Sequence, residues 1–338
     1  MDPVKPGALK PGEIVGIVSP SWFGGPSFER RLNRGIRQIE ALGFRTRIGS
    51  HALQNAGWVS ACPEERASDL HDMFRDPEVR AIIATIGGDH ACQLLPLIDW
   101  DLIRANPKIF IGFSDITVLN VAIWVETGMV TFNGPSVMTD WAEAPEMPAY
   151  ARNAALTAIT RPEPAGVLRP APAWTEEFLD WETGEDETRG RVMTPSSGWT
   201  WLRDGHVEGR LTGGCLESLQ HLRGTRWWPD FGDAILFLET SEERPSPATV
   251  DGILSDYENM GVLGQIRGMV IARPFGYTDD DRLQLHEVIR DRTARWAFPV
   301  VADIDAGHTS PMLTLPIGCR ARLDSAGKVL EIMEAAVR

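Results

Sequence analysis

A serine stands where a short apolar strand is predicted to turn directly into a helix, in the run Gly-Phe-Ser-Asp at residues 112–115. Residues 108–111 have the pattern of a buried strand, and residues 116–126 that of an apolar helix. A serine at such a corner projects from the sheet, and the first amides of the helix face the group that its hydroxyl would attack. The pattern therefore makes Ser114 a candidate nucleophile, although Ile116 fills the last glycine position of the usual G-x-S-x-G elbow. The alternative is that Ser114 only caps the helix.

A serine hydroxyl is a weak nucleophile at neutral pH, so this chemistry needs a base beside it and an acid that orients the base. His308 is the best candidate base, because it follows the apolar strand around residues 300–301, and sheet proteins place active groups in such loops. A histidine base predicts that kcat/KM rises with pH, with a midpoint near roughly 6.5. His90 is a weaker candidate. The five remaining histidines are expected in solvated positions: His51, His71, His206, His221 and His286.

Glu239 is the candidate acid, since it ends the apolar strand predicted at 234–239 and is expected to be half buried there. A buried carboxylate needs a partner, and an imidazole N–H is a natural one. Asp303 and Asp305 are rivals, the second only three residues from His308. Alternatively, Glu239 caps the next turn with help from Arg244.

A glycine pair, Gly87 and Gly88, follows the apolar strand predicted at 81–85. Glycines let the backbone approach a ligand closely and present amides to an oxyanion. The following Asp89 also makes the run similar to the Gly-Gly-Asp phosphate loop of some kinases, which continues with Gly-Thr, whereas this chain has His-Ala. A second glycine pair precedes Cys215, for which a buried thiol is favoured over a nucleophile.

The composition of the chain limits the kinds of partner that it can bind. The formal net charge of -14 argues against a nucleic acid polymer or a membrane, and is compatible with a small-molecule or peptide substrate in a local pocket. No stretch reaches the roughly 18 apolar residues of a membrane helix, and the first 13 residues lack an apolar signal core, so a cytoplasmic protein is expected. No residue cluster has metal-ligand spacing, so neither a metal nor another cofactor is expected.

The chain of 338 residues suggests two domains. Strands and helices alternate over residues 1–140, which predicts a doubly wound parallel sheet. Residues 141–204 are rich in proline and are expected to form an irregular linker and loop. Residues 205–338 are predicted to form a second, smaller α/β domain. The element predictions include strands at 14–18, 44–48, 129–132, 234–239 and 268–272 and helices at 63–75, 247–259 and 279–292.

Taken together, these motifs resemble the LD-carboxypeptidase superfamily of serine peptidases, and most closely its microcin C immunity (MccF-like) branch. The resemblance covers nearly the whole chain, and the order and spacing of the motifs carry it. They are, in chain order, Pro11-Gly12-Glu13-Ile14, Val18-Ser19-Pro20-Ser21, Ile86-Gly87-Gly88-Asp89, Gly112-Phe113-Ser114-Asp115, Leu211-Thr212-Gly213-Gly214, Leu236-Phe237-Leu238-Glu239, Gly307-His308 and Leu315-Pro316-Ile317-Gly318.

The resemblance implies a catalytic triad of Ser114, Glu239 and His308. It also implies an oxyanion hole made by the backbone amides of Asp115 and of Gly88 or Gly87, and usually a homodimer. One position departs from the family pattern, since Cys215 stands where the family commonly has asparagine.

The branch assignment rests on the aromatic segment 174–181, which is similar to the loop that stacks on the nucleobase in MccF-like enzymes. Trp174 and Trp181 are therefore predicted to bind substrate, although they could equally pack between domains or subunits. The predicted activity is hydrolysis of the amide bond of aminoacyl-nucleotide (microcin C-type) compounds. The alternatives are an LD-carboxypeptidase acting on murein tetrapeptides, a nucleotide-dependent small-molecule kinase that uses the Gly-Gly-Asp loop, and a binding protein without catalysis.

Overall fold

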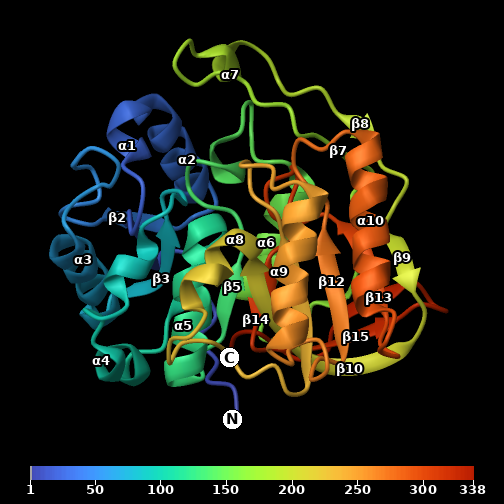
Figure 1. Ribbon diagram of the computed structural model, residues 1–338. Coiled ribbons are helices and arrows are strands. Elements are labelled where there is room, and N and C mark those ends of the chain that lie inside the picture. Colours follow the sequence, from blue (N-terminus) through green and yellow to red (C-terminus); the bar gives the residue numbers. More distant parts are fainter. Residues whose placement is uncertain (1) are drawn as a thin grey trace.

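Two large sheets frame the molecule in the computed structural model, which describes residues 2–338 (Figure 1). The N-terminal sheet has the strand order β14-β5-β4-β3-β1-β2. Its first five strands along the chain run parallel, and β14 joins antiparallel to β5. The strands are β1 (Ile14–Val18), β2 (Arg45–Ile48), β3 (Val79–Ala84), β4 (Ile109–Gly112), β5 (Thr131–Asn133) and β14 (Leu315–Ile317).

Helices cover both faces of this sheet, which explains why β1 and β4 are buried along their whole length. Apolar residues of α3, α4 and α5 pack with one face, and those of α2 and α6 with the other. The doubly wound fold predicted from the alternation is thereby confirmed. The helices are α1 (Gly24–Ser27), α2 (Glu29–Ala41), α3 (Pro63–Arg75), α4 (Trp100–Ala105), α5 (Thr117–Thr127) and α6 (Ala149–Thr160).

The C-terminal sheet has the order β6-β16-β15-β10-β11-β12-β13-β9, with parallel strands from β10 to β13. Helices α9 and α10 lie in front of it in Figure 1, each beginning at a side-chain cap, Ser246 and Thr278. Its elements are β6 (Gly166–Leu168), β9 (Thr200–Arg203), β10 (His206–Cys215), α8 (Leu216–Leu219), β11 (Ala234–Glu239), α9 (Pro247–Asn259), β12 (Gly268–Ala272), α10 (Asp279–Thr293), β13 (Val300–Ile304), β15 (Arg320–Asp324) and β16 (Val329–Ile332).

The two sheets share one interior, because each large apolar cluster contains residues from both. A hydrogen bond from the amide of Cys215, at the end of β10, to Thr117 Oγ1 (2.9 Å) joins the second sheet to the helix that follows Ser114. The chain ends pair as well, since Ala8 N donates to the carbonyl of Arg338 (2.9 Å). The two sheets are therefore joined through their shared interior and through a direct hydrogen bond.

Segment 141–204, predicted to be irregular, contains regular elements. Its prolines flank helix α6, and Pro148 occupies the N-cap, where a proline costs nothing because the helix needs no N–H there. Strands β6 and β9 of the segment extend the second sheet at both edges. The remainder lies at the top of Figure 1. It holds β7 (Ala173–Trp174), α7 (Glu185–Thr188) and β8 (Thr194–Pro195).

The remaining helical turns of the chain are η1 (Ala91–Leu94), η2 (Ser114–Ile116), η3 (Asp140–Ala142) and η4 (Gln220–Leu222). Within residues 2–338, none of the helices combines the length and the apolar character that crossing a membrane requires.

Candidate active site

Ser114 lies at the sharp turn between β4 and α5 with a backbone φ of 60°, a conformation that non-glycine residues rarely adopt. Such strain is characteristic of nucleophile elbows and other functional turns. The Ser114 side chain caps neither η2 nor α5, so the capping alternative is wrong. Ile116 stands where the usual elbow has its last glycine, and it packs closely on Gly112. A methyl group added at Gly112 would lie 2.6 Å from Ile116, so Gly112 supplies the close approach that this elbow needs.

The glycine pair lies beside the candidate nucleophile. A methyl group added at Gly87 would lie 2.9 Å from Ser114 Oγ and 3.4 Å from Asp115 N, so a side chain there would fill the space beside both atoms. Gly88 has a φ of 137°, and a methyl group added to it would lie 2.9 Å from Trp22 N. The amide of Asp115 belongs to the first helical turn, where N–H groups have no intrahelical acceptor. The space beside Ser114 Oγ is therefore kept free of side chains by Gly87 and lies next to the first helical turn.

The carboxylate of Asp115 holds the glycine loop in place. Asp115 Oδ2 accepts hydrogen bonds from Ser21 Oγ (2.6 Å) and from the amide of Ala91 (2.7 Å), and Ser21 Oγ accepts from the amide of His90 (3.0 Å). Burial raises the pKa of Asp115, while these donors favour its charged form. The role of the Asp115 side chain has no local signal in the sequence, since its partners lie up to 94 residues away.

His308 and Glu239 form a buried pair. Nδ1 of His308 and Oε2 of Glu239 are 2.8 Å apart, and the Glu239 side chain has no solvent exposure. The preceding Gly307, with a φ of 75°, lies so close that any side chain there would overlap the carboxylate. The ring edge of Phe113 contacts the imidazole, with the two ring centroids 5.0 Å apart. Glu239 therefore contacts an imidazole, as predicted from the sequence.

The two rival acids are engaged elsewhere. Asp305 binds Arg273 Nη1 (2.8 Å) and Trp199 Nε1 (2.8 Å), and Asp303 contacts His286 Nε2 (3.2 Å). His286 is buried, so its predicted solvated position is wrong, and its Nε2 contacts Asp303 of β13 instead of solvent. Burial would raise the pKa of Asp303, but His286 and other partners lower it.

A cavity of about 420 Å³ brings the candidate residues together, since it is lined by Ser114, His308 and the glycine pair. Its other wall is aromatic and includes Phe28, Phe178 and Trp181. Arg191 also lines it and donates to Glu143 Oε1 (2.5 Å). Phe28 and Phe178 are candidate substrate contacts that the sequence analysis missed.

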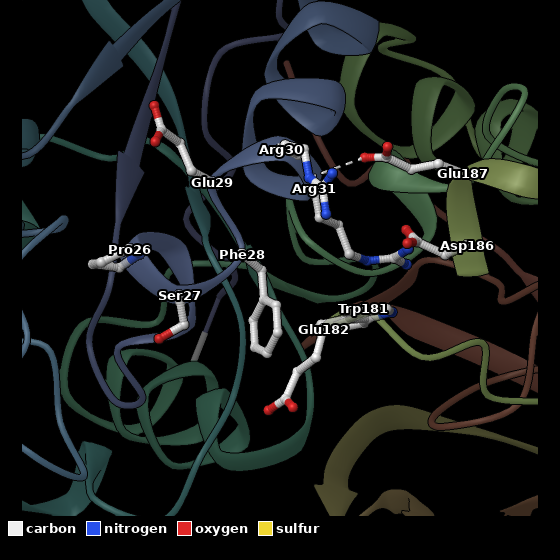
Figure 2. A pocket seen from close by; sticks show the side chains of 10 residues that line it. All are labelled: Pro26, Ser27, Phe28, Glu29, Arg30, Arg31, Trp181, Glu182, Asp186 and Glu187. Carbon is white, nitrogen blue, oxygen red and sulfur yellow. Dashed lines mark hydrogen bonds and ion pairs between the residues drawn. The ribbon is translucent and has the colours of Figure 1, made fainter. Parts of the chain in front are cut away.

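Trp181 is held between neighbours rather than free in a loop. Its ring meets Phe28 edge to face, at 5.4 Å between centroids, and the guanidinium of Arg31 lies 4.2 Å from its centroid. Arg31 is buried and donates to Asp186 (2.7 Å) and Glu143 (2.5 Å), which ties this segment to α2. Figure 2 shows this arrangement from an adjoining hollow of about 540 Å³ that shares Phe28 and Trp181 with the cavity.

Trp174 lies apart from this wall, and the cavity is lined without it. Its ring packs against Arg273, whose guanidinium is 4.5 Å from the ring centroid, and against Arg282 of α10 at 5.3 Å. The structure thus gives Trp174 a packing role and brings only Trp181 of the two predicted tryptophans to the cavity.

Cys215 lies opposite Glu239 in the parallel β10–β11 register and is buried. Burial raises the pKa of its thiol well above the usual value, and the charge of Glu239 adds to this effect. A thiol in this state is a poor nucleophile, consistent with the predicted buried role. Across residues 2–338, no group of three or more His, Cys, Asp or Glu side chains is arranged to hold a metal ion.

The chain belongs to the LD-carboxypeptidase family, whose N-terminal domain model matches residues 15–134 and whose C-terminal domain model matches residues 208–323. It is 30% identical to the microcin C7 self-immunity protein MccF of Escherichia coli, over 98% of this chain and 96% of that protein. It is 31% identical to a Bacillus subtilis protein named "Probable murein peptide carboxypeptidase", over 98% and 95% of the two chains.

Solved structures agree with this membership. The structure of MccF in complex with glutamyl sulfamoyl guanosine superposes with a TM-score of 0.90 at 29% sequence identity, covering 99% of this chain and 100% of that one. The two-domain α/β architecture and the predicted family are thus confirmed.

Proposed function

We propose that this protein is a serine hydrolase in which Ser114 is the nucleophile, His308 the general base and Glu239 the residue that orients the base. Ser114 Oγ attacks the carbonyl carbon of an amide, and its proton passes to Nε2 of His308. Glu239 accepts a hydrogen bond from the Nδ1–H of His308, which fixes the tautomer and stabilises the imidazolium that forms. The contact of 2.8 Å between Glu239 and His308, in the cavity that Ser114 lines, is the observation that carries this assignment.

The tetrahedral intermediate places its negative oxygen beside the amides of Asp115 and of Gly88 or Gly87. Collapse breaks the C–N bond, and His308 returns the proton to the leaving amine. Water then attacks the acyl-serine ester, with His308 again acting as base, and releases the acid. In this mechanism the Gly-Gly-Asp run supplies oxyanion donors. The close approach of Gly87 to Ser114 Oγ favours this role over phosphate binding in a kinase.

The choice of acid is open to a direct comparison. Glu239→Gln should lower kcat by about 10⁴-fold, because the amide cannot favour the required tautomer or stabilise the imidazolium. Asp305→Asn should change kcat far less, since Asp305 binds Arg273 and Trp199. Steady-state kinetics on the two purified variants measures this difference. A larger loss in Asp305→Asn would exclude Glu239 as the orienting acid.

The proposed substrate is an aminoacyl-nucleotide of the microcin C type, cleaved at its amide linkage. The aromatic wall of Phe28, Phe178 and Trp181 supports this choice, because nucleobases stack on such side chains and because these residues line the same cavity as Ser114. A relative with a solved structure binds glutamyl sulfamoyl guanosine. Murein tetrapeptides are the second candidate, supported by the relative named for murein peptides.

A side-by-side assay decides between the two substrates. The enzyme would be given an aminoacyl sulfamoyl adenosine and an L,D-linked murein tetrapeptide at matched concentrations, with products followed by mass spectrometry. We expect a higher kcat/KM for the sulfamoyl adenosine. Preference for the tetrapeptide would move the assignment to the murein carboxypeptidase.

Trp181→Ala should lower kcat/KM for the sulfamoyl adenosine by about 5- to 150-fold, because a base–aromatic stack contributes roughly 1–3 kcal/mol. The loss should fall mainly on KM, since the stack is equally strong in the ground and transition states. A substrate with the same acyl group but no base should be hydrolysed nearly as well by the variant. Trp174→Ala is the matched control and should affect both substrates equally. Equal losses on both substrates in Trp181→Ala would make this ring structural too.

Three further features are proposed on the sequence and the family resemblance. The domain division at residues 1–140, 141–204 and 205–338 can be tested by limited proteolysis. A homodimer can be tested by light scattering. The cytoplasmic location stays a prediction that cell fractionation can check.

A further inference from the structure

The imidazole nitrogen that the mechanism reserves for Ser114 has another neighbour. Oε2 of Glu242 lies 2.8 Å from Nε2 of His308, within ion-pair distance. Nε2 has no hydrogen-bond partner among residues 2–338, so the contact with Glu242 is an ion pair. His308 therefore stands between two carboxylates, with Glu239 at Nδ1 and Glu242 at Nε2. Neither the sequence pattern nor the mechanism proposed above assigns a role to Glu242.

We propose that Glu242 is a positioning residue that holds His308 in its protonated form in the free enzyme and that the substrate displaces. This inference rests on the proposed role of His308 as the base. An imidazolium cannot accept the Ser114 proton, so the pair with Glu242 keeps the site inactive. Entry of the acyl group into the cavity, which Glu242 also lines, would separate the carboxylate from Nε2 and release the base.

The two carboxylates differ in how easily they can move. Glu239 ends strand β11 and is buried, so leaving His308 would strand its charge away from water at a large cost. Glu242 lies in the connection between β11 and α9, and 61% of its side chain is exposed. Its carboxylate is hydrated on leaving the imidazole, so Glu242 leaves at a smaller cost than Glu239 would. Only Glu242 can therefore act as a reversible partner.

The charges around His308 determine whether its pKa rises or falls. Burial alone would lower the pKa of His308, but Glu239 and Glu242 outweigh burial and raise it to about 10. The other ionisable side chains that line the cavity are Asp89 after β3, Asp140 in η3, Glu177 after β7 and Arg191 after α7. A base must be neutral to act, so kcat/KM of the free enzyme should rise through an alkaline midpoint. An alkaline midpoint is thus expected in place of the value near 6.5 that an unperturbed histidine would give.

The test compares Glu242→Gln with Glu243→Gln, which removes the same charge from the next exposed residue. Loss of an opposite charge in contact lowers a pKa by roughly 1–3 units. We expect Glu242→Gln to move the kcat/KM midpoint down by that amount and to raise kcat/KM at pH 7 by about tenfold for each unit. The pH profile of kcat should hardly change, because it reports the complex from which Glu242 has already been displaced. Glu243→Gln should leave both profiles as in the parent enzyme.

Equal shifts in the two variants would reduce the effect to general surface charge and overturn the proposal. A kcat profile that shifts as far as kcat/KM would show that Glu242 stays on His308 in the complex, and would overturn the displacement. An NMR titration of the His308 ring separates this proposal from the proposed function, because it needs no substrate. A lower His308 pKa in Glu242→Gln alone would support the pairing even if no tested compound were hydrolysed, and an unchanged pKa would refute it.

Discussion

Ser114→Ala should lower kcat by about a million-fold, the scale at which loss of the nucleophile disables a triad whose members act as one unit. The fold should survive, because Ser114 Oγ caps no helix and alanine keeps the Cβ that packs beside Gly87. The measurement is single-turnover hydrolysis with purified variant, together with thermal unfolding. An unchanged Tm with lost turnover would locate the defect in the chemistry.

Contamination by active enzyme is the main hazard in this experiment, so the variant should be expressed from a host that lacks the parent gene. Activity within tenfold of the parent enzyme in such a preparation would remove Ser114 from the mechanism.

His308→Ala should be nearly as severe as Ser114→Ala, since the nucleophile has no other base within the proposed site. The double variant should be no slower than either single variant, because once one member is lost the other has nothing to contribute. Kinetics on the three proteins measures this non-additivity. Losses that multiply in the double variant would show that the two residues act independently, against the proposed triad.

His308→Ala should also lower the free energy of unfolding. Removing the imidazole leaves Glu239 buried without its partner, and breaking a buried ion pair in this way typically destabilises a protein by about 3–5 kcal/mol. His308→Gln is the companion variant, because its side-chain amide can still donate to the carboxylate. A folded His308→Gln protein without activity would separate the catalytic loss from misfolding.

The sequence carried the framework of this site because its signals were local. Apolar runs of strand length placed β1, β11 and β12 at their observed residues, and α3 and α9 likewise matched their predicted limits. Ser114 was identifiable because a strand and a helix meet on either side of it. Glu239 was identifiable because a carboxylate at the end of an apolar strand has to find a partner. The fold class follows from the same alternation.

What the sequence did not reveal depends on contacts between distant segments. The Asp115 carboxylate holds the glycine loop through Ser21, and Arg31, from a distant part of the chain, packs directly on Trp181. Trp174 and Trp181 belong to one aromatic segment, and the sequence does not distinguish their roles. Their surroundings in the fold do, because Trp174 packs on Arg273 and Arg282, whereas Trp181 lines the cavity.

The pH dependence of kcat/KM also depends on contacts between distant segments. A histidine in isolation predicts a neutral midpoint, and nothing in the run 240–246 signals that one of its carboxylates will approach an imidazole 66 residues further along the chain. The protonation state of the base is therefore a property of the assembled site.

The central claim is that Ser114 is a nucleophile activated by His308 and Glu239. It is tested most directly by treating the protein with a fluorophosphonate probe and locating the adduct by peptide mass spectrometry. We expect a single phosphonylated peptide, modified at Ser114. The adduct should be absent in Ser114→Ala and should form much more slowly in His308→Gln, and its rate should rise with pH as His308 deprotonates. An adduct on another serine, or labelling of Ser114 at the same rate without His308, would contradict it.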